Sequence, residues 1–234
     1  MSFVHRQEKA QALVSLFIQH YWDTEEITQS YGLVHELYGY ETHISQPTQE
    51  VLKQIRSSTS RHIRFTPDVI IASKIRSPSD RVILVDYKVM TTPRYKLGNN
   101  QWDQGQVEAD AWDNYMSLWS VGVKVALLIY CAYHSRPILC DWPQKDVITL
   151  ERTKVQVTGK GSGTDYCNIK LTSFRTFDKF IEDTFGVPQD VSQRLLRNLL
   201  AEAKQNPLLH ISHDRRSPDK NRQTGFNWEM EYET

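Results

Sequence analysis

The chain has 234 residues, of which 39% are hydrophobic and 24% charged, a composition typical of a globular protein able to bury a core. Basic and acidic side chains number 28 each, so the zero net charge excludes a general attraction to nucleic acid, and such a partner needs a local basic surface. Three cysteines exclude a disulfide framework, and the lack of a signal peptide or long apolar run predicts a cytoplasmic protein without membrane contact.

Helical patterns dominate the first part of the chain. Apolar side chains recur at helical spacing from Phe3 to Tyr21, and weaker patterns extend from Glu25 to Leu37 and from Pro47 to Ile55. We therefore expect residues 1–60 to form a helical segment that packs on a core. The next stretch, Arg61 to Phe65, predicts a strand with exposed basic residues.

Two apolar, β-branched runs follow, and they flank a turn-forming stretch of serine, proline and aspartate. They predict a β-hairpin whose strands are covered on both faces. Residues two apart on a strand share a face, and pairing of the strands brings the start of the first towards the end of the second. Three charged residues interrupt the runs and should therefore lie together: Asp68, Asp86 and Lys88.

Burying these charges is costly unless they pair with one another or bind a cation. Two carboxylates suit Mg²⁺, and a neighbouring lysine can orient a water or stabilise charge developing on a phosphate. The alternative is a buried salt bridge within a hairpin.

At these positions the chain resembles a known family. Pro67-Asp68 followed by Asp86-Tyr87-Lys88 is similar to the PD-(D/E)xK motif of the restriction-endonuclease-like nuclease superfamily, in order, gap and strand context. The resemblance covers roughly residues 60–133. The strings Glu202-Ala203-Lys204 and Pro218-Asp219 are similar by accident, because they fall in the wrong order, in a helical pattern and a polar tail.

The resemblance implies an α/β fold: a restriction-endonuclease-like core with a central mixed β-sheet flanked by helices, and a helical C-terminal extension. It implies that Asp68, Asp86 and the carbonyl of Tyr87 bind Mg²⁺, for which Mn²⁺ can substitute, and that Lys88 positions or activates the attacking water. Members often carry a further acid on a preceding helix. The sequence does not choose among four candidates: Glu8, Glu26, Glu36 and Glu50.

The segment after Lys88 predicts a loop and then a helix. In the loop, Arg94, Tyr95 and Lys96 place two cations and an aromatic ring where a nucleic-acid backbone would pass, although an ordinary solvated loop is an equal alternative. Residues 101–119 predict a helix, on which Gln106 could lie near the metal, as a glutamine does in some members. The Gln-x-x-x-Tyr motif of the RecB-like branch is absent.

The apolar run from Lys124 to Tyr133 predicts a strand parallel to the preceding one, joined to it by a right-handed crossover. Residues 148–157 and 167–171 predict a further hairpin, with Lys160 in its glycine-rich turn as a possible phosphate contact. Cys131 and Cys140 are expected to be buried free cysteines and not zinc ligands.

The last third predicts two amphipathic helices, Thr176 to Phe185 and Asp190 to Lys204, separated by Gly186-Val187-Pro188. A helix-turn-helix reading would use polar residues of the second helix, but packing on the sheet fits the pattern better. The expected boundaries are a nuclease core at 61–172, C-terminal helices at 173–206 and a polar tail at 207–234. The polar residues of the second helix that a helix-turn-helix would use are Gln189, Gln193, Arg194 and Arg197.

The sequence therefore favours a metal-dependent nuclease that hydrolyses phosphodiester bonds, with DNA as the expected partner and an endonuclease as the expected type. One alternative is a non-cleaving module on the same scaffold that binds nucleic acid or a partner protein. Another is a structural protein with a buried salt-bridge network. The sequence is also compatible with a homodimer or a complex with a partner protein, but it demands neither.

Overall fold

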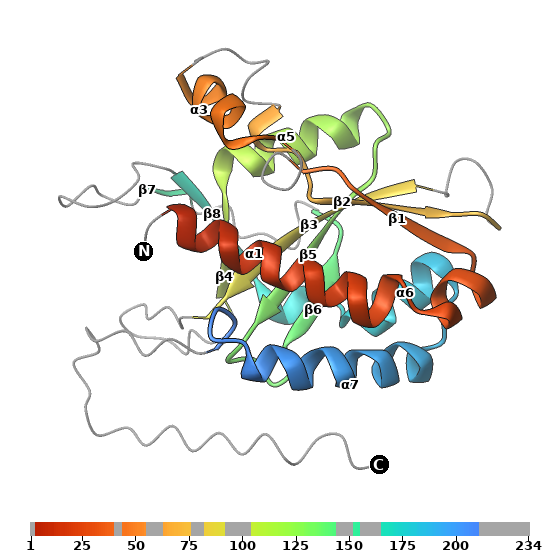
Figure 1. The fold of residues 1–234 in the computed structure, drawn as a ribbon. Helices are drawn as coiled ribbons and strands as arrows, with labels where there is room; N and C mark the ends of the chain where they lie inside the picture. The colour runs from red at the N-terminus through yellow and green to blue at the C-terminus, as the bar shows by residue number, and fades with distance from the viewer. Residues whose placement is uncertain are drawn as a thin grey trace, which may run out of the picture.

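The computed structural model describes residues 3–39, 44–54, 63–75, 82–91, 104–143, 152–154 and 165–210. Its centre is a five-stranded mixed sheet of order β1-β2-β3-β5-β6, beside a three-stranded sheet of order β4-β8-β7 (Figure 1). Helices flank the larger sheet, so the expected α/β class with a central mixed sheet is confirmed. The strands are β1 (Leu33–Leu37), β2 (Val69–Ser73), β3 (Val82–Met90), β4 (Gln104–Glu108), β5 (Val125–Cys131), β6 (Ile138–Asp141), β7 (Arg152–Lys154) and β8 (Asp165–Lys170).

One helix begins the chain, one lies between β1 and β2, one lies in the crossover to β5 and two follow the sheets. The first, α1, continues directly into a π-helical turn at Ile18–Trp22, and a second such turn follows at Glu26–Ser30. Within the described residues no helix combines the length and the apolar character needed to cross a bilayer. The helices are α1 (Phe3–Phe17), α3 (Gln46–Gln54), α5 (Ala109–Ser120), α6 (Phe177–Phe185) and α7 (Gln189–Gln205).

The predicted hairpin and crossover are both present. β2 pairs antiparallel with β3, with Val69 opposite Val85, and β3 pairs parallel with β5. The chain passes from β3 to β5 by way of β4 and α5. Every residue of β5 is buried, as expected for a central strand covered on both faces.

Each face of the large sheet has its own apolar cluster. On one face α1, α6 and α7 pack together, so the two C-terminal helices lie on the sheet beside the first helix of the chain (Figure 1). On the other face α5 and the small sheet contribute the side chains that cover β3 and β5. The prediction that the C-terminal helices pack on the sheet is confirmed, and Gly186 (φ 75°) ends α6 in the left-handed conformation that favours glycine.

Two elements predicted as helix are strands. The helix expected over 25–37 stops at Gly32 (φ 59°), after which Leu33–Leu37 pairs along β2 as an edge strand. The helix expected over 101–119 begins only at Ala109, because Gln104–Glu108 forms strand β4 against β8. In both cases pairing with a distant segment overrides the local helical pattern.

Two further differences concern short elements. The strand expected over 61–65 is a helical turn at its described residues, 63–65, closed by the Thr66 hydroxyl, which donates to Ile63 O at 3.0 Å. The edge strand β6 was not predicted. The hairpin of β7 and β8 is confirmed, although it belongs to the second sheet.

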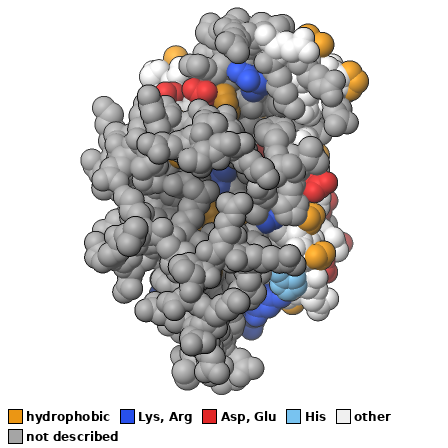
Figure 2. All heavy atoms as spheres, turned by 90° about the vertical axis from the view of Figure 1, so that its left-hand side faces the viewer, with side chains coloured by type: hydrophobic (Ala, Val, Ile, Leu, Met, Phe, Trp, Pro, Cys, Tyr) orange, Lys and Arg blue, Asp and Glu red, His pale blue; other side chains and the backbone are white. Residues whose placement is uncertain are grey.

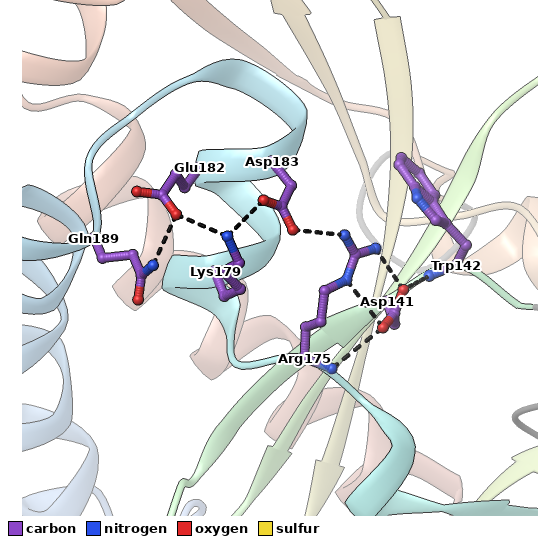
Figure 3. Close-up of polar contacts among 7 residues, drawn as sticks. All are labelled: Asp141, Trp142, Arg175, Lys179, Glu182, Asp183 and Gln189. Carbon is purple, nitrogen blue, oxygen red and sulfur yellow. Dashed lines mark hydrogen bonds and ion pairs between the residues drawn. The ribbon is translucent and has the colours of Figure 1, made fainter.

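A network of charges joins β6 to α6 (Figure 3). The Arg175 guanidinium donates to both carboxylate oxygens of Asp141, through Nη2 at 2.6 Å and Nε at 3.1 Å. It also donates to Asp183, which in turn pairs with Lys179. This two-bond geometry fixes the start of α6 against the edge of the sheet.

Candidate active site

Asp68 lies where the chain enters β2. Its backbone N–H donates to Val85 O at 3.0 Å, and its carboxylate Oδ2 accepts the N–H of Tyr87 at 2.8 Å. The ladder between β2 and β3 ends at the pair Val69–Val85, so Tyr87 lies just beyond it. The buried carboxylate of Asp68 therefore takes the place of a strand partner for Tyr87.

The end of β1 holds Asp68 from the other side. The backbone N–H groups of Tyr38 and Gly39 both donate to Asp68 O, at 2.8 and 3.1 Å. A Cβ atom on Gly39 would lie 2.9 Å from Asp68 Cα and 3.0 Å from its Oδ1. Only glycine allows the backbone to approach this closely, so Gly39 fixes the position of the Asp68 carboxylate.

Asp86 and Lys88 form an ion pair on β3. The Lys88 Nζ lies 2.8 Å from Asp86 Oδ2, and Asp86 is only 3% exposed. The contact between this oxygen and the ammonium is therefore an ion pair that does not meet the angular limits of a hydrogen bond.

Burial alone would lower the pKa of Lys88, but the negative charges of Asp86 and Asp68 outweigh it and raise the pKa above its ordinary value. The charge of Glu108, the residue just before α5, acts in the same direction. Lys88 is therefore an ammonium at neutral pH. Its dependence on both aspartates shows that the three groups of the motif share one electrostatic neighbourhood.

A tyrosine from α5 completes the surroundings of Asp86. Tyr115 is buried. Burial, followed by the negative charges of Asp86 and Asp68, raises the pKa of Tyr115 well above its ordinary value, so its hydroxyl is neutral at neutral pH. Asp86 thus lies near a neutral tyrosine hydroxyl as well as the Lys88 ammonium.

The residue between the two charged ones, Tyr87, points to the opposite face of the sheet. Its hydroxyl accepts from Trp22 Nε1 at 2.9 Å, and its ring packs edge-on to Phe17 with centroids 5.3 Å apart. Tyr21 and Phe177 extend the same aromatic cluster. The cluster packs β3 on the face of the sheet opposite to Asp86 and Lys88, so these two charged side chains extend from a well-packed strand.

The oxygen atoms of this group are of the chemical type that a magnesium ion binds. Mg²⁺ in proteins commonly takes one or two carboxylates and keeps several waters. Asp68 and Asp86 would supply the carboxylates, and the Tyr87 carbonyl lies beyond the end of the β2–β3 ladder, where β2 offers no partner. Among the described residues, no group of three or more His, Cys, Asp or Glu side chains is arranged to hold a metal, so a fully protein-made cage is absent there.

Several predicted site residues lie outside what the structure describes. The backbone of Gln106 belongs to β4, but its side chain is outside the described residues, and the predicted helical position was wrong. The expected nucleic-acid contacts also lie outside the described residues: Arg94, Tyr95, Lys96 and Lys160. On the face drawn in Figure 2, the described side chains mix apolar, acidic and basic types, without a continuous basic patch among them.

The other candidates have more ordinary surroundings. Glu26 pairs with Arg194, while Glu8 and Glu36 are exposed on α1 and β1; the side chain of Glu50 is outside the described residues. Of the residues considered for groove reading, Gln189 and Gln193 donate to Glu182 and Asp178 within the fold, and Arg197 is exposed. All three cysteines, Cys131, Cys140 and Cys167, are free and buried, which confirms the expectation for Cys131 and Cys140.

Sequence reasoning missed three residues at this site: Gly39, Glu108 and Tyr115. Tyr115 stands beside the apolar stripe of its helix and resembles a core residue, so its position near Asp86 was not evident from the sequence.

No protein-family model matches the chain, and no curated protein matches it either.

Proposed function

We propose that this chain is a magnesium-dependent nuclease with a PD-(D/E)xK-like site, which hydrolyses phosphodiester bonds, with DNA as substrate and cleavage within the strand. The observation that carries the proposal is the grouping of Asp68, Asp86 and Lys88 at the end of the β2–β3 ladder, with the ammonium 2.8 Å from Asp86 Oδ2. The sheet order and the parallel β3–β5 pair support a restriction-endonuclease-like core. The choice of DNA rests on the resemblance of the motif.

Each residue has a role that follows from its position. Asp68 and Asp86 hold the cation through carboxylate oxygens, with the Tyr87 carbonyl as a further ligand. Lys88 lies at the exposed side of this group, with 29% of its side chain accessible, so it can contact a water or a phosphate oxygen that arrives from solvent. Its ammonium orients the attacking water and offsets negative charge on the scissile phosphate.

Electrostatics explains why such a site needs a divalent ion. Two buried carboxylates against one ammonium leave a net negative charge, which would repel a phosphodiester. A bound magnesium ion would reverse that charge, polarise the phosphate and make hydroxide accessible near neutral pH. The protein's own part is to hold the oxygens in place and keep Lys88 next to them.

A substrate panel tests the proposal. Purified protein is incubated with Mg²⁺ or Mn²⁺ and with supercoiled plasmid, single-stranded DNA, branched DNA or RNA. Asp86→Asn and Lys88→Ala should lower cleavage by at least about a hundredfold, since they remove a ligand and the residue that orients the water. Circular dichroism checks that these variants are folded.

The matched controls are Asp190→Asn and Lys204→Ala, exposed residues of α7 on which the site does not depend. They should cleave as the wild type does. Cleavage that persists in Asp86→Asn would refute the proposed roles. Binding to nucleic acid without cleavage by the wild type would instead favour the non-cleaving module, and absence of both would favour a structural salt bridge.

A further inference from the structure

The two edges of the large sheet differ in whether the chain covers them. Strand β6 forms one edge, and the segment before α6 lies along it, with Cys140 N–H donating to Arg175 O at 2.9 Å and Leu139 bridged to Thr176. Strand β1 forms the other edge and, among the described residues, pairs with β2 alone (Figure 1). An open edge strand presents unpaired backbone groups that can bond a further strand.

The hydrogen bonds between β1 and β2 show which backbone groups of β1 point outward. Lys74 N–H donates to Gly32 O, and Tyr38 N–H donates to Asp68 O. Bonded and non-bonded pairs alternate along antiparallel strands, so the even-numbered residues of β1 bond β2. The N–H and C=O groups of Leu33, His35 and Leu37 therefore point away from β2, and among the described residues they have no hydrogen-bond partner.

This edge lacks the usual protection against pairing and has apolar flanks. Proteins often protect an open edge with lysine, proline or a bulge, but Leu33–Leu37 contains neither residue and its register with β2 is continuous. Tyr38, just after the strand, is 46% exposed. Ile75 is 68% exposed and lies against Gly32, just before the strand, where a Cβ atom would be 3.2 Å from its Cγ2.

We propose that β1 pairs antiparallel with β1 of a second copy of this chain, so that the two large sheets continue into one another across a twofold axis at His35. In this register Leu33 lies opposite Leu37 of the second copy, and the outward N–H and C=O groups of both strands are bonded. A twofold axis makes the same surface serve both copies. The inference goes beyond the proposed function and does not depend on it.

The side chains that this register brings together favour a second copy as the partner. Gly32 falls opposite Tyr38 of the second copy, and because glycine has no side chain, the tyrosine ring can cross it and cover Ile75. Symmetry forms this contact twice. Val34 falls opposite Glu36 of the second copy, whereas a shift of the register towards the end of β1 would place Glu36 opposite itself, which like charges disfavour.

A charge substitution tests the register. In Val34→Lys/Glu36→Lys the ammonium introduced at position 34 meets the one at position 36 of the second copy, and symmetry repeats the clash. We expect the dissociation constant of the dimer, measured by sedimentation equilibrium, to rise roughly tenfold or more. Val34→Lys alone faces the Glu36 carboxylate of the second copy and should associate at least as well as the wild type.

The matched control is Val121→Lys/Val123→Lys, which changes two exposed valines between α5 and β5 and adds the same number of lysines. It should associate as the wild type does. Circular dichroism checks that each variant is folded.

Amide hydrogen exchange of the wild type gives a second measurement that needs no substitution. The outward N–H groups of Leu33, His35 and Leu37 should exchange slowly at high protein concentration and quickly at low concentration, because only the second copy bonds them. The N–H groups of Val34 and Glu36 bond β2 in either state, so their protection should not change with concentration.

A wild type that remains monomeric up to about 100 µM would overturn the inference. A dimer whose outward β1 amides stay unprotected would also overturn it, since the copies would then associate through another surface. Equal dissociation constants for the wild type and the folded double variant would have the same meaning. If the double variant does not fold, the concentration dependence of the outward amides decides the question.

Discussion

Replacing Lys88 with methionine removes the positive charge that accompanies Asp86 and nearly preserves side-chain volume. In the wild type the ammonium lies 2.8 Å from Asp86 Oδ2, and the aspartate is 3% exposed. The variant leaves the buried Asp86 carboxylate without a positive neighbour from position 88. The free energy of unfolding should therefore fall in the absence of a divalent ion.

The distance sets the scale of the effect. Two unit charges 2.8 Å apart attract by about 6 kcal/mol at an effective dielectric constant near 20, and less here because the lysine side chain is 29% exposed. Breaking a buried pair by removing one partner costs about 3–5 kcal/mol, so we expect about 3 kcal/mol for this part-exposed one. In a chain of this length that corresponds to a melting temperature lower by about 6–12 °C.

Divalent ions should reverse most of that loss. An ion that binds only the folded state stabilises it by about 2.7 kcal/mol at a hundred times its dissociation constant. The assay is thermal unfolding of Lys88→Met with and without Mn²⁺, beside the exposed control Lys204→Met. We expect Mn²⁺ to stabilise Lys88→Met more than the wild type at equal concentration, because the competing ammonium is gone.

The double variant Asp86→Asn/Lys88→Met separates charge from packing. It removes both charges, so it should be more stable than Lys88→Met alone and should respond little to Mn²⁺. The reasoning is refuted if Lys88→Met is destabilised but insensitive to Mn²⁺, since the two aspartates would then not recruit a cation. It is also refuted if Lys88→Met is as stable as the wild type.

Three further substitutions test how the site and the surrounding fold are supported. Gly39→Ala puts a Cβ 2.9 Å from Asp68 Cα, so it should lower both the melting temperature and the Mn²⁺ affinity. Calorimetry that shows an unchanged affinity would argue that the close contact between the Gly39 and Asp68 backbones does not position the carboxylate. Trp22→Phe leaves the Tyr87 hydroxyl without its donor and should cost about 1–3 kcal/mol in urea unfolding, with Mn²⁺ affinity little altered. Asp141→Ala breaks the two-bond pair with Arg175, whose side chain is 30% exposed, and should cost about 2 kcal/mol by the same measurement; a change under about 0.5 kcal/mol would show that solvent already screens the pair.

The central part of the fold could be predicted from the sequence because its signals are local. The strands β2 and β3 are two apolar runs that lie close together in the sequence and pair antiparallel, and β5 is an uninterrupted apolar segment after a helix. Asp68, Asp86 and Lys88 stood out because charge is rare in such runs. Their proximity follows from strand pairing and side-chain alternation, both of which are fixed over a few residues.

The strands β1 and β4 could not be predicted in the same way. Leu33–Leu37 becomes a strand because β2 offers an edge, and Gln104–Glu108 because β8, some 60 residues later in the chain, pairs with it. Neither partner is visible in the local pattern, which therefore suggested helix. The same limit hid Gly39 and Tyr115, since each acts on an aspartate from a distant segment.

A hairpin that carries two aspartates and a lysine is compatible with either a salt bridge or a cation site, because the motif alone does not set the distance between the carboxylates. The backbone around Asp68 is held by Tyr38 and Gly39, just after β1, and the segment before it by Asn114, which bonds Phe65 O. If the chain is a nuclease, substitutions at these supporting positions should change cation affinity; if the charges are only a salt bridge, the same substitutions should change stability alone.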